Sequence, residues 1–305
     1  MRKSVLLLPL ILLVLLTGCV HNSPFTGSGE YFFQAMGKDG EIVVTADTER
    51  LKESMPAVLE TGTVLDELFD RSTRLSISFY KDSYSESDPY PADLSSFDFH
   101  GGFEGNYGSF TVNTAISWSK EFHKEKQDGV KYYTNDEGTL NLAVPKSGLL
   151  LFASDDYIGA YTELFSQRVL NIPSDTAENM ADSLMGMYVR SPQTMINLGF
   201  ELPYSVIAKM SDAVLYVLEN EEDGSFYFNA DITMQSEDLA RTLLQLLRNQ
   251  VVAALRLEGV RPDYKELAAQ YSSEGNLVML RGVEMSSDQV VSFAGQISEI
   301  SGGVL

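Results

Sequence analysis

Two adjacent segments carry the strongest structural signal in the chain: Ala213-Val-Leu-Tyr-Val-Leu-Glu219 and Phe226-Tyr-Phe-Asn-Ala-Asp-Ile-Thr233. They flank the polar turn Asn220-Glu-Glu-Asp-Gly224. Runs rich in Val, Ile, Tyr and Phe on either side of a short Gly-containing turn are typical of a β-hairpin. Ser236 then caps an amphipathic segment with leucines at helical spacing, which predicts a helix after the hairpin.

The same reading extends to both sides of this hairpin. Before it, the sequence predicts a strand at 186–190 and a helix within 192–210. After it, the sequence predicts a strand at 277–283 and a final helix that begins at Ser287. The second half of the chain therefore reads as alternating strands and helices.

The first half repeats this order. Its expected helices begin at Asp47 or Thr48, run from 109 to 126, and run from 155 to 167. Its expected strands are 41–46, 75–80, 97–103, 139–144 and 148–153, of which 75–80 alternates as a half-buried strand.

Local identities support an internal duplication. Ser96–Phe99 matches Ser225–Phe228, Glu137–Leu140 matches Glu274–Leu277, and Ser154-Asp155 matches Ser287-Asp288, at offsets of 129, 137 and 133 residues. We therefore predict an α+β protein with two similar units in tandem and antiparallel sheets packed against helices. The predicted units are residues 30–168 and 183–305, joined by a linker at 169–182.

The N-terminus carries a targeting signal. Arg2 and Lys3 precede an apolar run that ends in Leu16-Thr17-Gly18-Cys19. This order of a positive region, an apolar region and small residues is that of a secretory signal. A membrane-spanning helix is disfavoured, because the run is too short for ~30 Å of hydrocarbon and contains Pro9.

The tetrapeptide resembles the lipobox of bacterial lipoproteins. The resemblance implies cleavage after Gly18, a diacylglyceryl thioether on Cys19 and acylation of the new amine. Residues 1–18 would then be a lipoprotein signal peptide, and residues 19–29 a flexible tether. The protein would be held at a membrane of the cell envelope, and Val20 in place of Asp favours the outer membrane. An ordinary signal peptide with a chance cysteine is the alternative.

Charge and composition exclude several classes of function. The chain carries a net charge of −21, so it lacks the basic face that nucleic-acid binding needs. Electrostatic adsorption to anionic lipid is disfavoured for the same reason. Cys19 is the only cysteine, so no disulfide or thiolate metal site is expected in the body.

Residue patterns predict no catalytic residue, no metal site and no cofactor. His100 reads as a surface-strand residue and His123 as a residue near a helix C-terminus, without the spacing of a zinc site. The glycine-rich stretch 101–108 lacks the Lys-Ser or Lys-Thr of a phosphate loop, and indicates a strand that bulges or packs closely against another element.

One loop stands out when the two halves are compared. Residues 81–95 carry Tyr84 and Tyr90 among acids, serines and prolines, where the second half has only the short turn 220–224. We predict Tyr84 and Tyr90 to be a candidate interaction loop. Trp118, the only tryptophan, is expected in the core, with an interface anchor as the alternative.

The function expected from these patterns is that of a lipid-anchored envelope protein that binds a protein or a small apolar ligand without catalysis. Two alternatives stay open. One is a carrier of an apolar ligand bound between the two halves. The other is a hydrolase that uses carboxylates the sequence does not single out.

Overall fold

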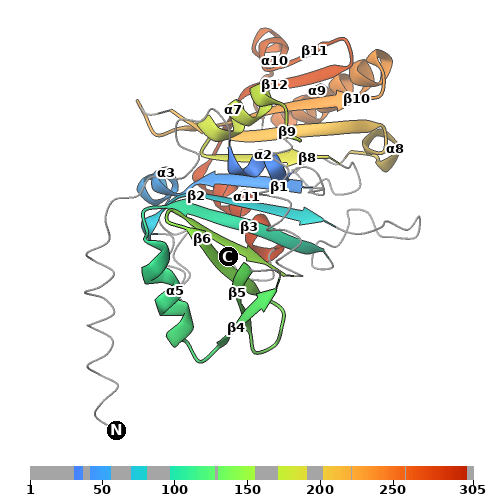
Figure 1. The fold of residues 1–305 in the computed structure, drawn as a ribbon. Helices are drawn as coiled ribbons and strands as arrows, with labels where there is room; N and C mark the ends of the chain where they lie inside the picture. The colour runs from blue at the N-terminus through green and yellow to red at the C-terminus, as the bar shows by residue number, and fades with distance from the viewer. Residues whose placement is uncertain are drawn as a thin grey trace.

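A single sheet organises the protein in a computed structural model, which describes residues 31–36, 42–55, 70–80, 97–127, 130–154, 171–190, 202–220, 222–257 and 259–300. Twelve strands in these ranges form one antiparallel sheet in the order β11-β12-β10-β9-β8-β1-β2-β3-β7-β6-β5-β4 (Figure 1). The strands are β1 Ile42–Asp47, β2 Ser72–Tyr80, β3 Asp98–Gly105, β4 Phe122–Gln127, β5 Val130–Asn135, β6 Asn141–Lys146, β7 Leu149–Ala153, β8 Met185–Val189, β9 Met210–Glu219, β10 Phe226–Met234, β11 Tyr271–Glu274 and β12 Leu277–Met285. The predicted α+β class is confirmed.

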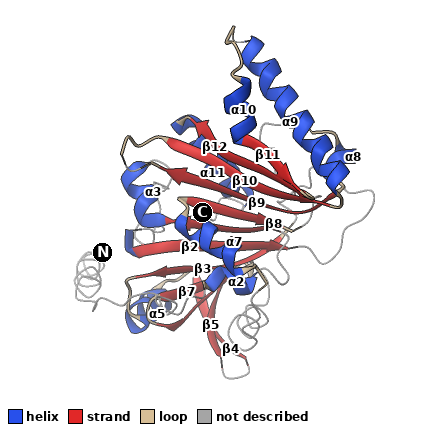
Figure 2. Cartoon of the chain, turned by 90° about the horizontal axis from the view of Figure 1, so that it is seen from above, coloured by secondary structure: helices blue, strands red, loops and turns tan. Residues whose placement is uncertain are grey.

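Helices cover both faces of the sheet. One layer buries its apolar side chains in a core cluster on one face: α3 Thr48–Ser54, α5 Ser109–Trp118, α8 Tyr204–Ile207, α9 Glu237–Leu257, α10 Tyr264–Gln270 and α11 Ser287–Ile300. The opposite face is covered by α2 Phe32–Met36 and α7 Ser174–Asp182 (Figure 2). In the described part of the chain, no helix combines the length and apolarity needed to cross a membrane.

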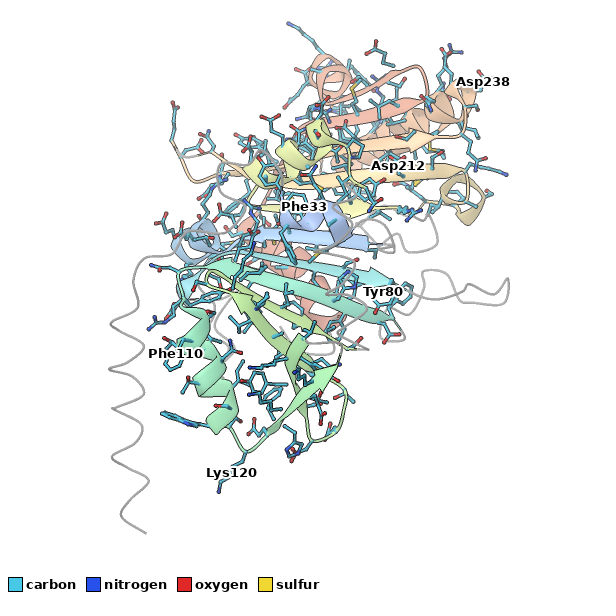
Figure 3. All side chains as sticks on the ribbon, in the orientation of Figure 1. Phe33, Tyr80, Phe110, Lys120, Asp212 and Asp238 are labelled. Carbon is cyan, nitrogen blue, oxygen red and sulfur yellow. The ribbon has the colours of Figure 1, made fainter. Side chains whose placement is uncertain are left out.

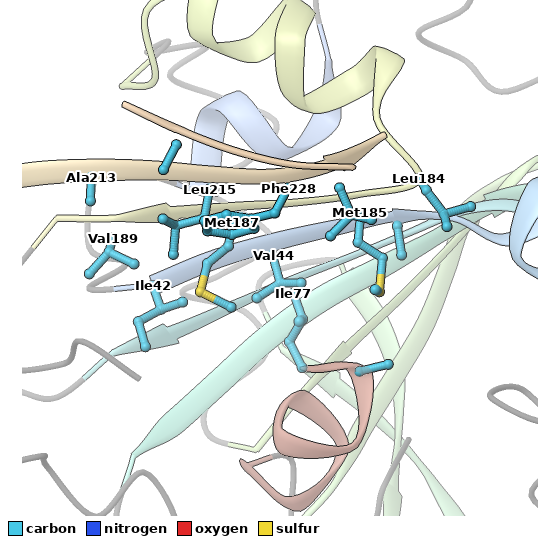
Figure 4. Packing of buried hydrophobic residues seen from close by; sticks show 14 of the residues in the cluster. Ile42, Val44, Ile77, Leu184, Met185, Met187, Val189, Ala213, Leu215 and Phe228 are labelled. Atoms are coloured by element: carbon cyan, nitrogen blue, oxygen red, sulfur yellow. The ribbon is translucent and has the colours of Figure 1, made fainter. Parts of the chain in front are cut away.

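The two halves meet in one strand pair. β1 and β8 run antiparallel, with Val44 directly opposite Met187. One row of residues crosses the sheet through this pair: Leu280, Ala230, Leu215, Met187, Val44, Ile77, Gly101 and Phe152. All of these residues are buried, and Figure 4 shows several of their side chains packed together.

This row is symmetric about its centre. Counted outward from Val44, the strands are β1, β2, β3 and β7; counted outward from Met187, they are β8, β9, β10 and β12. The helices follow the same rule, since α2 precedes β1 as α7 precedes β8, and α3 follows β1 as α8 follows β8. The predicted tandem of similar units is thus present as a pseudo-two-fold repeat within one sheet.

Of the local sequence matches that suggested a duplication, one joins structurally equivalent positions and another does not. Gly101 and Ala230 occupy equivalent places at an offset of 129 residues, which agrees with the match of Ser96–Phe99 to Ser225–Phe228. The match of Glu137–Leu140 to Glu274–Leu277 is not structural. The matched residues lie in the turn before β6 in the first half and in the turn before β12 in the second half. The structural counterpart of β12 is β7 and not β6.

The predicted linker 169–182 contains helix α7, so that part of the domain prediction is corrected. Ala177 and Met180 of α7 are fully buried, and Met180 packs over Gly186. Because α7 is the counterpart of α2, it belongs to the second unit rather than to an extended connection.

The predicted helix 109–126 is also wrong in its second half. The helix ends at Trp118, and Phe122–Gln127 form strand β4, which pairs with β5. Ser119 terminates the helix in an extended conformation (φ −63°, ψ 143°). His123 therefore lies on a strand, where its Nε2 is 2.8 Å from Asp136 Oδ1. The segment 75–80, expected to be half-buried, has buried side chains on both faces from Leu75 to Phe79.

The glycines of β3 allow close packing, as predicted. A Cβ on Gly101 would lie 2.3 Å from Phe152 Cζ, and a Cβ on Gly102 would lie 2.5 Å from Phe32 Cε1. The two glycines face opposite sides of the sheet, so each helps one layer approach the strand. The stretch is the interior of a strand rather than a phosphate loop.

Replacement of Gly101 by Ala should reduce the free energy of unfolding by about 1–3 kcal/mol, since the added methyl group has no room between Phe152 and the carbonyl oxygen of Ser76. Urea denaturation of both variants would measure this. The control is Gly108→Ala, where φ is −83° and the nearest neighbour of a Cβ is 3.5 Å away. Equal losses in the two variants would contradict the packing argument.

Candidate functional site

The described residues offer little for catalysis. They contain no group of three or more His, Cys, Asp or Glu side chains placed to hold a metal ion. His100 is buried at 7% exposure and lies against the Tyr80 ring, with 5.2 Å between ring centroids, so its predicted surface position is wrong. Its burial follows from the position of β3 between β2 and β7 near the middle of the sheet.

Several side chains have pKa values that are raised because the side chains are buried. Burial raises the pKa of Tyr107, whose hydroxyl donates to the Phe103 carbonyl oxygen and accepts a bond from the Leu150 amide at 3.0 Å. This tyrosine ties the end of β3 to β7. Burial also raises the pKa of Asp212 on β9, and a hydrogen bond from Thr233 acts against that rise. The Asp212 carboxylate in turn contributes to a raised pKa of Tyr188.

The outer strands of the second half carry part-buried polar residues next to these groups. Arg281 donates to Asp231 Oδ1 at 2.5 Å and to the Ala230 carbonyl oxygen at 2.9 Å. Asn229 Oδ1 accepts a 2.6 Å bond from the amide of Gly282, whose φ is +63°. These bonds join β10 to β12, so we assign these polar residues a structural role.

Large exposed apolar side chains in the described residues lie on α5, where α9 turns into α10, and singly at Val291 on α11. On α5, Phe110 (Figure 3) is 80% exposed. Trp118 on the same helix is 57% exposed, so the core position expected for Trp118 is wrong. Leu257, Val260 and Tyr264, where α9 turns into α10, are 90%, 49% and 63% exposed. We call this second group the α9–α10 tip. Exposed apolar clusters on a polar protein mark candidate interaction sites.

The length of α9 produces the tip. Its 21 residues span about 32 Å. Its buried residues, Ala240, Leu243 and Leu247, all lie in the first half. The second half extends past the outer strands, with α10 beside it (Figure 2). A helix that continues beyond its own core contacts presents its apolar residues to solvent.

Two capping motifs hold the tip in one shape. Gly259, with φ +77°, ends α9, and the Val260 amide donates to the Leu255 carbonyl oxygen at 2.8 Å. Asp263 caps α10 by accepting bonds from the amides of Lys265 and Glu266 at 2.8 and 3.2 Å. Val260 and Tyr264 thus lie beside backbone groups that these two caps hold in place.

Sequence reading missed this site, although signals for it exist. Gly259 follows the last helical residue, and Pro262-Asp263 precedes the next helix, which is the stop-and-start pattern of two successive helices. The predicted sites Cys19, Tyr84 and Tyr90 lie outside the described residues, as does the predicted helix 155–167.

The join between the halves is filled by protein. β1 pairs with β8 along it, and Val43 and Val44, on opposite faces of β1, are both buried. A ligand shared by the halves would therefore have to lie over a face of this pair.

Comparisons with known proteins extend only to the fold. No family model and no curated protein matches the chain. Crystal forms I, III and IV of TP0453 are similar in structure, with TM-scores of 0.56, 0.54 and 0.58 and sequence identities of 11%, 10% and 12%. The matches cover 88%, 86% and 90% of this chain and 96%, 97% and 96% of those chains. A similar fold thus occurs in a protein of very different sequence.

The raised pKa of Asp212 has a consequence for stability. A carboxyl whose pKa is higher in the folded than in the unfolded state destabilises the fold when ionised. That cost is fully present above the folded pKa and absent below the unfolded value of about 4. Asp212→Asn should thus raise the free energy of unfolding at pH 7 by less than about 1 kcal/mol, because the group is partly solvated.

Urea denaturation at pH 7 and pH 3 would test this, and the gain should vanish at the lower pH. The control is Asp238→Asn, a position on α9 whose side chain is 93% exposed. A loss of stability at pH 7 in Asp212→Asn would show that the carboxylate stabilises the fold.

Proposed function

We propose that this protein is a lipid-anchored component of the bacterial cell envelope that binds a partner protein without catalysis. The observation that carries the proposal is the α9–α10 tip, where three large apolar side chains are exposed on a turn fixed by two caps. An exposed apolar surface gains most from binding when it is already ordered, because little conformational entropy is lost.

The anchor is supported by the sequence at Leu16–Cys19. A diacylglyceryl group with a further acyl chain on Cys19 provides the two or more chains that stable anchoring requires. The Gly- and Ser-containing residues 20–29 reach about 35 Å when extended, so the body would stay near its membrane. Val20 after the cysteine favours the outer membrane.

The non-catalytic part of the proposal is supported by the side-chain inventory. Tyr107, whose pKa burial raises strongly, has its hydroxyl held by backbone hydrogen bonds, and the exposed His123 pairs with an exposed Asp136. A catalytic site usually combines a perturbed group with a second group that can accept its proton. The Tyr107 hydroxyl instead bonds backbone groups of Phe103 and Leu150.

Cys19→Ala should abolish lipidation and release the protein from membranes, because the acyl chains would be its only stable attachment. Metabolic labelling with palmitate and partitioning into Triton X-114 would measure this in the native host. Cys19→Ser, which retains a small polar residue without the thiol, should behave identically. Unchanged labelling and partitioning in either variant would refute the lipid anchor.

A photocrosslinking amino acid at Leu257 should give a discrete adduct in intact cells, because this side chain is 90% exposed at the tip. The same amino acid at Asp238, exposed at the other end of α9, is the matched control (Figure 3). Adding Val260→Ser and Tyr264→Ser should remove the adduct while the free energy of unfolding changes by less than about 1 kcal/mol. Equal adducts from positions 257 and 238 would refute the tip as a binding site.

A further inference from the structure

The two edges of the sheet are built differently. At one edge, β11 has four residues, contacts α9 and α10, and accepts a 2.5 Å bond from Arg248 to the Tyr271 carbonyl oxygen. At the other edge, β4 has six residues and pairs, within the described residues, only with β5. An edge strand of this kind presents unpaired backbone N–H and C=O groups that another strand can bond.

Strand alternation sorts the charges of β4 by face. Lys124 and Lys126 share one face, while His123 and Glu125 share the other. Lys131 of β5 lies directly opposite Lys126 and adds a third lysine to the first face. We call Lys124, Lys126 and Lys131 the lysine face.

The positive charges of the lysine face are not balanced by described carboxylates. All three side chains are exposed, and no described carboxylate forms an ion pair with any of them. Like charges directly opposite in a sheet are destabilising. The opposite face is different, because His123 pairs with Asp136 there. In a chain of net charge −21, this is a local cationic surface beside an open edge.

The lysine face also lies next to exposed aromatic surface. Lys124 is opposite Tyr133, whose hydroxyl donates to the Asn113 carbonyl oxygen of α5 at 3.1 Å, so α5 packs on this same side of the sheet. Trp118 ends α5 at 57% exposure, only a few residues before β4 begins. A bound segment would therefore meet lysines, an indole ring and a free strand edge together.

We propose that β4 accepts an extended acidic segment of a partner protein by strand addition. The backbone of that segment would bond the open edge, and its alternate carboxylates would face Lys124, Lys126 and Lys131. A lipid headgroup would satisfy the lysines but would leave the edge backbone to water. A second β4 would satisfy the edge but would bring lysines against lysines, which disfavours self-pairing.

The test uses the full chain in detergent micelles and an eight-residue peptide of alternating Val and Glu. Fluorescence of Trp118, the only tryptophan, reports binding beside β4. Replacement of Lys126 and Lys131 by Glu keeps a like-charge pair in place but reverses its sign. It should weaken the peptide's affinity about tenfold, since two exposed ion pairs become two repulsions. The charge-matched control is Lys209→Glu, in the turn between α8 and β9, with Arg241→Glu on α9; both side chains are exposed and lie outside β4 and β5, so the affinity should stay within about twofold.

A peptide N-methylated at alternate residues separates strand addition from simple charge attraction, and its affinity should also fall about tenfold. If the variant with two glutamates does not fold, the variant Lys126→Gln with Lys131→Gln can be used in its place. Its neutral side chains remove the repulsion between the two positions. This variant too should bind the peptide more weakly than the parent. Equal binding of the methylated peptide would overturn the proposal. So would peptide-independent binding to phosphatidylglycerol vesicles that needs the same lysines.

Discussion

The pairing of β1 with β8 is the contact on which the rest of the structure depends. It places Val44 opposite Met187 and so fixes how the two halves are aligned. Side chains alternate faces along a strand, so a slip of one residue here would turn one half's apolar set away from its helices. The row through Val44 and Met187 is buried from Leu280 to Phe152, and the main core cluster includes residues of both halves. The repeat therefore shares one sheet and does not form two separate bodies.

The sequence predicts this architecture where local patterns and tertiary packing agree. The hairpin of β9 and β10, the cap of α3 by Asp47 and the helix after Ser236 follow from residues that act on their own neighbours. Prediction from the sequence fails where the same residue pattern fits both a helix and a strand. Phe122–Gln127 alternates charged residues that fit a helix surface or an edge strand equally, and only the pairing with Val130–Asn135 selects the strand.

The candidate sites were harder to predict, because the exposure of a side chain depends on tertiary contacts that local sequence patterns do not reveal. Helical spacing could not tell whether Trp118 faces the core, because that depends on how far α5 extends over the sheet. The exposure of Leu257 likewise depends on α9 continuing past Val251 and Val252, the last of its residues that pack against the core. Gly259 and Asp263 are recognisable in the sequence as a helix stop signal and a helix N-cap. Such signals do not show whether the turn between the helices projects into solvent. Cys19, Tyr84 and Tyr90 stay predictions from sequence.

The symmetry of the sheet also explains where the halves can differ. From the centre outward, β1, β2, β3, β7 and β6 match β8, β9, β10, β12 and β11 in order, and each neighbouring pair is antiparallel. Among the strands that the structure describes, the β4–β5 hairpin has no counterpart beyond β11. The 10-residue α5 corresponds in position to the 21-residue α9 with α10. Changes near the β1–β8 pair would disturb packing in both halves, whereas additions at the outer ends disturb only their own neighbours. Both surfaces proposed for binding lie on these divergent outer elements, as expected when a duplicated scaffold acquires partners without disturbing its centre.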